Sequence, residues 1–185
     1  AAALAEAQKR GYAEANPAAD VEGLDAARKT VILAALSFGV LLSPAKIPVT
    51  GIADLTAEQT EVAEALGCAV RLIGHTERIG DRILALVSPH LVAAANPLCH
   101  VDGVYNGILV DGNMLGRAFF YGAGAGKLPT ASAVVADILN AAAPGEPVRL
   151  PAWRVAEDGD YAPADERRVR RCFVLSGCSG CAERT

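Results

Sequence analysis

A change of hydrophobic period near Gly67 constrains the fold of this chain more than any other feature. Before it, apolar residues recur at helical spacing over residues 24–39, and Thr56 with Gln59 matches a capping box that opens a second helix. After it, β-branched or alternating runs cover residues 69–75, 83–92, 104–110 and 115–121. This order predicts an α+β fold, with a mixed or largely antiparallel sheet of about four strands covered by helices on one face.

The last two predicted strands are followed by one more helix. Asp111-Gly112-Asn113 separates these strands and predicts a β-hairpin. Beyond the glycine-rich residues 122–126, Pro129 is expected to begin a helix that runs to about Asn140, because proline suits the first helical position. We therefore expect one domain over residues 1–143.

Composition excludes some classes of partner. The 185 residues, 52% of them hydrophobic, suffice for one domain with a core. A net charge of -4 offers no attraction to a polyanion, so we expect no nucleic acid as a partner. The longest apolar run, residues 31–42, is well short of the roughly 20 residues that cross a bilayer. We expect a buried helix there and no membrane partner.

Both ends of the sequence carry expectations of their own. The chain opens on Ala1 with a helical pattern and no basic leader, so we expect it to start inside a larger protein, without a signal peptide. Several prolines and a polar stretch predict an extended C-terminal arm over residues 144–185, or the beginning of a truncated regulatory domain.

Five cysteines, an odd number, do not suggest a disulfide framework. Reduced thiols and a cytoplasmic location fit better.

The cysteines near the C-terminus have a spacing that metal ligands also show. They are Cys172, Cys178 and Cys181. No second pair lies close in sequence, and the histidines, which are His75, His90 and His100, lie in distant segments. We therefore expect a terminal tail with reactive thiols there, and no metal site.

Carboxylates gather around one lysine between Gly11 and Lys29. Glu14, Asp20 and Glu22 lie in an irregular stretch, and Asp25 stands four residues before Lys29 on one face of the predicted helix. Clustered like charges are costly unless a cation is bound, and a substrate ammonium is such a group. A solvated lysine beside a first-turn acid is the alternative interpretation of the pair.

A glycine-rich loop lies between the last predicted strand and the last helix. Its glycines are Gly122, Gly124 and Gly126. Backbone N–H groups in such a place can bind anions, but Lys127 and Leu128 break the two common phosphate-binding patterns. A tight turn that allows close packing explains the glycines equally well.

Three segments together resemble the homoserine dehydrogenase family. They are residues 11–29 followed by 32–39, residues 96–98 with 101–106, and residues 119–139. The resemblance covers roughly residues 4–140. It implies the substrate-binding and dimerisation domain of an oxidoreductase that interconverts L-homoserine and L-aspartate 4-semialdehyde with NAD(P). That reaction belongs to the biosynthesis of threonine and methionine.

The resemblance also implies a role for each candidate residue. Lys29 would be the catalytic proton donor or acceptor, Glu14, Asp20 and Asp25 would bind the substrate, and Gly122, Gly124 and Gly126 would approach the cofactor, NADP or NAD. It further implies that the domains pair through their sheets as a homodimer.

Two departures from the family pattern limit these expectations. The family's N-terminal Rossmann domain, with its G-x-G-x-x-G, does not occur in these residues, and neither do a second lysine and a monovalent-cation site expected upstream. Asn113 also stands where the family usually has aspartate. We therefore expect the isolated chain to be inactive, and the alternative is a non-catalytic dimerisation or scaffold module that retains the fold.

Overall fold

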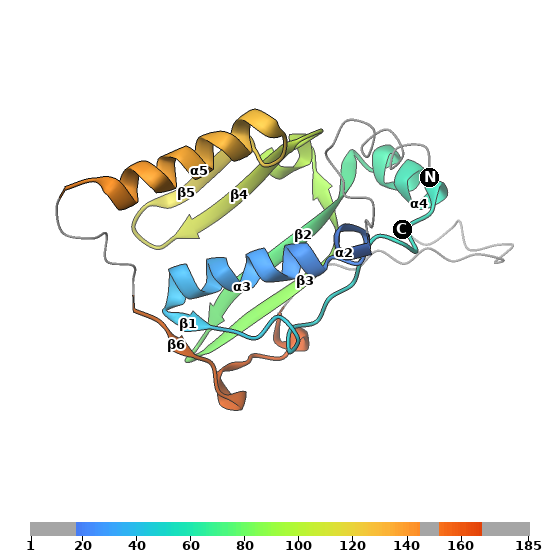
Figure 1. Cartoon of the computed structure of the whole chain (residues 1–185). Helices are drawn as coiled ribbons and strands as arrows, with labels where there is room; N and C mark the ends of the chain where they lie inside the picture. The colour runs from blue at the N-terminus through green and yellow to red at the C-terminus, as the bar shows by residue number, and fades with distance from the viewer. Residues whose placement is uncertain (1–17, 145–151, 168–185) are drawn as a thin grey trace, which may run out of the picture.

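The computed structural model describes residues 18–144 and 152–167 of the chain (Figure 1). The helices are α2 (Ala18–Val21), α3 (Leu24–Phe38), α4 (Ala57–Ala65) and α5 (Lys127–Ala142). The strands are β1 (Val40–Leu41), β2 (Cys68–Ile79), β3 (Arg82–Ala93), β4 (Tyr105–Gly112), β5 (Gly116–Ala123) and β6 (Arg154–Val155). Short 3-10 helices are η1 (Pro97–His100), η2 (Asp158–Asp160) and η3 (Ala164–Glu166). The α+β prediction is confirmed.

The described strands form three two-stranded sheets, not one sheet of about four strands. β2 pairs antiparallel with β3, β4 pairs antiparallel with β5 as the sequence predicted, and β1 pairs parallel with β6. The single predicted sheet is thus wrong, because η1 interrupts the chain between β3 and β4. Asn96 caps η1 by accepting from Leu98 N at 3.0 Å, and Pro97 has no N–H to extend a ladder. The chain leaves the first hairpin there and starts a second.

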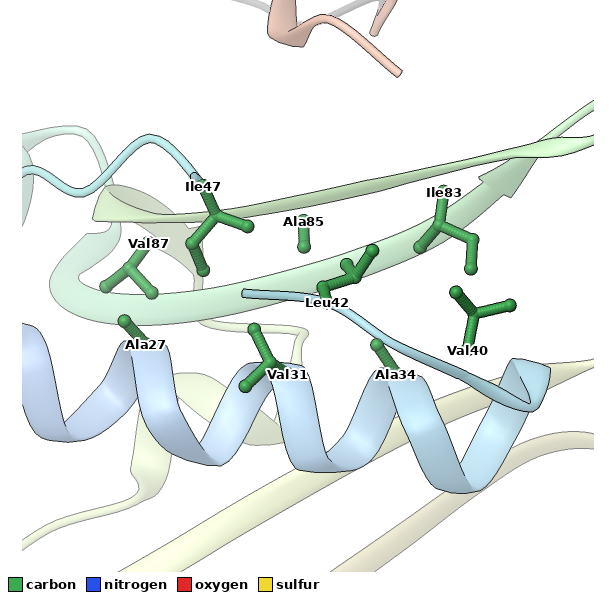
Figure 2. Close-up of a cluster of buried hydrophobic side chains, with 9 residues drawn as sticks. All are labelled: Ala27, Val31, Ala34, Val40, Leu42, Ile47, Ile83, Ala85 and Val87. Carbon is green, nitrogen blue, oxygen red and sulfur yellow. The ribbon is translucent and has the colours of Figure 1, made fainter. Parts of the chain in front are cut away.

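The core lies between α3 and the β2–β3 hairpin (Figure 2). One face of α3 presents Ala27, Val31 and Ala34, all at most 3% exposed, toward β3. The strand contributes Ile83, Ala85 and Val87, and the chain after α3 adds Val40, Leu42 and Ile47. Small side chains on α3 let the helix approach the hairpin closely, which fixes where the start of α3 lies.

Helix ends largely follow the sequence signals. Gly23 and Gly39 flank α3 with φ values of 80° and 73°, and the capping box of Thr56 and Gln59 is present at α4. The last helix begins at Lys127, not at Pro129 as predicted. The first turn of a helix leaves its N–H groups without intrahelical partners, so proline is also tolerated at the third position.

The described part of the C-terminal arm packs back onto the core. β6 extends β1, and Tyr161 bridges to Ile83 of β3, with Ala162 N donating to Ile83 O at 3.0 Å. The Tyr161 hydroxyl accepts from Ser43 N at 2.9 Å. Figure 1 shows this segment below α3, beside β1 and β3. Residues 145–151 and 168–185 of the predicted arm lie outside the described residues.

Tyr161→Phe is expected to lower the free energy of unfolding by about 1 kcal/mol, because the half-buried Ser43 N–H loses its acceptor. Urea unfolding at neutral pH measures the change. Tyr121→Phe is the matched control, since that side chain is 51% exposed and its hydroxyl makes no hydrogen bond to the described residues. Equal stability of Tyr161→Phe and the unsubstituted chain would show that the hydroxyl does not fasten the arm.

Within the described residues, no helix combines the length and apolar character needed to span a membrane.

Candidate functional site

Asp25 and Lys29 form an ion pair in the first turns of α3. Lys29 Nζ lies 2.7 Å from Asp25 Oδ2, and the side chains are 60% and 42% exposed for lysine and aspartate. The predicted pairing at a spacing of four residues is confirmed. Such an exposed pair stabilises a helix by only about 0.3–0.5 kcal/mol. The ammonium therefore stays open to solvent and keeps donors for a ligand.

Two glycines hold the start of α3 in place. Gly23 links α2 to α3 in the left-handed conformation, and a Cβ on it would lie 3.2 Å from Val49. Gly51 packs directly on the backbone of Val21 and Glu22, where a Cβ would come within 2.7 Å of Glu22 Cα. The next residue after Gly51 donates from its backbone N to Val21 O at 2.9 Å. The chain that carries the acidic residues is thus fastened to the loop before α4.

The other predicted substrate-binding acids are less directly connected. Asp20 lies on α2, which packs beside the start of α3 (Figure 1), and its side chain is exposed. Among the described residues, it forms no ion pair with Lys29. Glu14 lies outside the described residues. The structure therefore brings together Asp25 and Lys29, with Asp20 on the neighbouring helix.

The glycine loop joins β5 to α5. Gly124 N donates to Val104 O at 2.8 Å, and Gly126 precedes the helix with a φ of 112°. Gly122 has open space around it, since a Cβ there would meet no atom within 4 Å. No hydrogen bond or ion pair within the described residues connects this loop to α3. The two predicted halves of the site therefore lie in different parts of the fold. Lys29 is on α3, which packs on the β2–β3 hairpin, whereas the glycine loop follows the β4–β5 hairpin.

Arg71 connects the β2–β3 hairpin to the segment that leads into β4. Apart from its place in a predicted strand, nothing in the sequence indicated this role. Its guanidinium donates from Nε to Cys99 O at 3.2 Å and pairs through Nη2 with Asp102 Oδ1 at 2.7 Å. These contacts fasten β2 to η1 and to the chain that enters β4. This junction lies between the part of the fold that carries Lys29 and the hairpin that leads to the glycine loop.

The histidines lie outside this arrangement. His75 is on β2, His90 on β3 and His100 at the end of η1. His90 receives a guanidinium N–H from Arg167 at 3.2 Å while its Nδ1 lies 2.8 Å from Ser88 O. Across residues 18–144 and 152–167, no three His, Cys, Asp or Glu side chains group to hold a metal ion. Cys172, Cys178 and Cys181 lie outside the described residues.

Burial lowers the pKa of His75, and the positive charge of Arg167 lowers it further, against the opposing effect of Glu77. The unfolded chain therefore binds the proton first as the pH falls below about 6.5. The free energy of unfolding is therefore expected to fall as the pH drops from about 6.5 toward the lower pKa of His75 in the folded state. Urea unfolding from pH 7.5 to 5.5 measures the decline.

His75→Gln is expected to flatten this pH dependence, and the same substitution at the exposed His100 controls for losing an imidazole. Identical slopes for His75→Gln and the unsubstituted chain would contradict the assignment.

Comparison with known proteins agrees with the motifs around this site. The family model for homoserine dehydrogenase matches residues 1–139, three quarters of the chain. The chain belongs to the homoserine dehydrogenase family. The resemblance of residues 4–140 is thereby confirmed, and it includes α3, the junction at η1 and the glycine loop.

Individual homoserine dehydrogenases match the same part of the chain. The protein of Neisseria gonorrhoeae is 45% identical over 139 residues, which are 75% of this chain and 32% of that protein. The crystal structure of a homoserine dehydrogenase from Thiobacillus denitrificans matches 86% of this chain and 37% of its own, with 41% identity and a TM-score of 0.71. A hyperthermophilic archaeal homoserine dehydrogenase in complex with NADPH has a TM-score of 0.60 at 28% identity, over 80% of this chain and 41% of its own. The chain spans about a third of the length of the curated relatives it matches.

Proposed function

We propose that this chain supplies the substrate-binding and proton-transfer part of a homoserine dehydrogenase. The reaction is the NAD(P)-dependent interconversion of L-homoserine and L-aspartate 4-semialdehyde, in the synthesis of threonine and methionine. The observation that carries the proposal is the exposed Lys29–Asp25 pair at the start of α3, within the part of the chain that matches the family.

Lys29 is the proton carrier in this proposal. Reduction of the aldehyde places negative charge on its oxygen, and an ammonium can both stabilise that oxygen and protonate it. In the opposite direction the neutral amine accepts the hydroxyl proton of L-homoserine. Asp25 holds the ammonium of Lys29 through one oxygen at 2.7 Å, which orients the lysine on its helix face.

The acidic residues bind the amino group of the substrate. Asp25 has a second carboxylate oxygen that can accept from the α-ammonium. Asp20 on α2 and Glu14 complete the proposed pocket, and their negative charges favour a cationic ligand over a neutral one.

The glycine loop is the proposed contact with the cofactor, NADP or NAD. The space around Gly122 leaves its backbone open to a ligand, which fits the approach of a planar ring or a phosphate. A bound nicotinamide supplies the hydride. We propose that most of the nucleotide is held by another domain of the enzyme, because these 185 residues contain no G-x-G-x-x-G sequence. The isolated chain is then inactive or nearly so.

We further propose a cytoplasmic homodimer that pairs through the surface formed by the β4–β5 hairpin and α5. Large apolar side chains are exposed on both elements: Leu128, Val134, Val135, Ile138 and Leu139 on α5, and Ile108, Val110, Phe119, Phe120 and Tyr121 on β4 and β5. An apolar surface of this extent supports association. Sedimentation equilibrium at micromolar concentration is expected to give a dimer, and a monomer would contradict the proposal.

Binding of the amino acid tests the substrate half of the proposal on the chain itself. We expect L-homoserine to shift the NMR signals of the first turns of α3, and 4-hydroxybutyrate, which lacks the amino group, to shift them far less. Asp25→Asn should weaken the L-homoserine shifts. Equal shifts from both compounds, or none from L-homoserine, would contradict the pocket and favour the scaffold alternative.

A further inference from the structure

Asn106 and Gly124 interlock where the second hairpin meets the glycine loop. Asn106 lies on β4 opposite Gly122 of β5, and its side chain occupies the space that a side chain at residue 124 would need. A Cβ on Gly124 would overlap the Nδ2 atom of Asn106 and lie 2.5 Å from its Cγ. The carboxamide therefore rests on the backbone of the loop.

Space, not backbone conformation, explains the glycine at this position. Gly124 is not among the glycines with positive φ, whereas Gly126 is, with a φ of 112°. An alanine could adopt the backbone of Gly124, but its methyl group would have to displace the amide of Asn106. Asn106 is exposed and can rotate away, so the displacement itself costs little stability.

The displaced group is a polar carboxamide. Among the described residues, the carboxamide of Asn106 makes no hydrogen bond, so its two donors and its acceptor are free for a ligand. Gly124 N donates to Val104 O at 2.8 Å, and the rings of Tyr105 and Tyr121 stack on the other face of the hairpin with centroids 4.8 Å apart. The backbone of the loop is thus held at Gly124, and the amide of Asn106 lies against it.

We propose that Asn106 is a positioning residue for the cofactor. Its carboxamide, seated on Gly124, sets how closely the nicotinamide dinucleotide approaches the glycine loop. The functional part of this inference rests on the proposed homoserine dehydrogenase activity, whereas the interlock of the two residues does not.

The interlock predicts that the two residues act as one unit. In the enzyme completed with a nucleotide-binding domain, Asn106→Ala should raise KM for NADPH about tenfold and leave kcat within about twofold, because alignment with the loop is lost while Lys29 is untouched. Gly124→Ala should have the same effect by displacing the amide. The double substitution should then be no worse than either single one, since residues in contact are non-additive.

Gly112→Ala is the matched control in the same hairpin, because a Cβ there meets neighbours only at 3.7 Å or beyond. It should change neither KM nor the melting temperature. An unchanged KM in Asn106→Ala, or a double variant whose KM rise is the product of the two single rises, would overturn the proposal. A fall in melting temperature that accounts for the lost activity would also overturn it, since Asn106 would then be merely structural.

The interlock is also tested without activity, by NMR of the chain. The side-chain NH2 signals of Asn106 should move in Gly124→Ala and stay in Gly112→Ala. Unmoved signals in Gly124→Ala overturn the interlock. If these signals move but the unsubstituted completed enzyme oxidises no NADPH, the proposed function and the cofactor role both fail, and only the interlock stands.

Discussion

Lys29→Ala is expected to lower the rate of NADPH oxidation with L-aspartate 4-semialdehyde by about 10²- to 10⁴-fold, the usual contribution of a positioned general acid or base. The alkoxide that forms on the substrate would have neither a proton donor nor a nearby positive charge. The measurement is kcat in the enzyme completed with a nucleotide-binding domain. KM for the semialdehyde should change less, because the acidic residues that bind the amino group remain.

Two further lysine variants separate proton transfer from charge. Lys29→Arg keeps the positive charge, but a guanidinium does not give up its proton near neutral pH, so kcat should stay low while substrate binding is retained. Lys46→Ala removes an exposed lysine that pairs with Asp158 at 2.6 Å and not with Asp25, and it should leave kcat unchanged. A rate for Lys29→Ala within twofold of the unsubstituted enzyme would refute the assignment.

Gly51→Ala is expected to destabilise the chain by about 1–3 kcal/mol or more. The added methyl group would overlap the carbonyl oxygen of Val21 and crowd the backbone of Glu22, and neither can rotate aside. Relief requires α2 and the start of α3 to move, so binding of L-homoserine should weaken as well. Urea unfolding and NMR titration measure the two effects.

Gly159→Ala is the control for Gly51→Ala, because a Cβ at residue 159 meets nothing within 4 Å and the backbone there has no positive φ. It should alter stability by less than about 0.5 kcal/mol. Equal stability of the two variants would mean that Gly51 does not fix the start of α3.

Local features of the fold were predictable from the sequence. The helical period of α3, the capping box of α4 and the hairpin of β4 and β5 each depend on residues close together in the chain. The division into three sheets was not predictable, because it depends on where η1 turns the chain. The two-residue strands β1 and β6 are too short for a period and pair across more than a hundred residues.

The candidate site divides in the same way. The pairing of Asp25 with Lys29 follows from helical spacing alone. Contacts between distant segments gave no such signal: Arg71 with Asp102, Gly51 with Val21, and Asn106 with Gly124. The family resemblance covers these residues, but it identifies motifs and does not say which side chains touch.

Complementation of the chain with the nucleotide-binding domain of a homoserine dehydrogenase tests whether the chain supplies substrate binding and proton transfer. The measurement is NADPH oxidation on addition of L-aspartate 4-semialdehyde, with each part alone and with both together. Oxidation is expected only when both parts are present, and it should be lost in Lys29→Ala. A folded chain that associates with the nucleotide-binding domain but gives no semialdehyde-dependent oxidation would contradict the proposed function and identify a non-catalytic module.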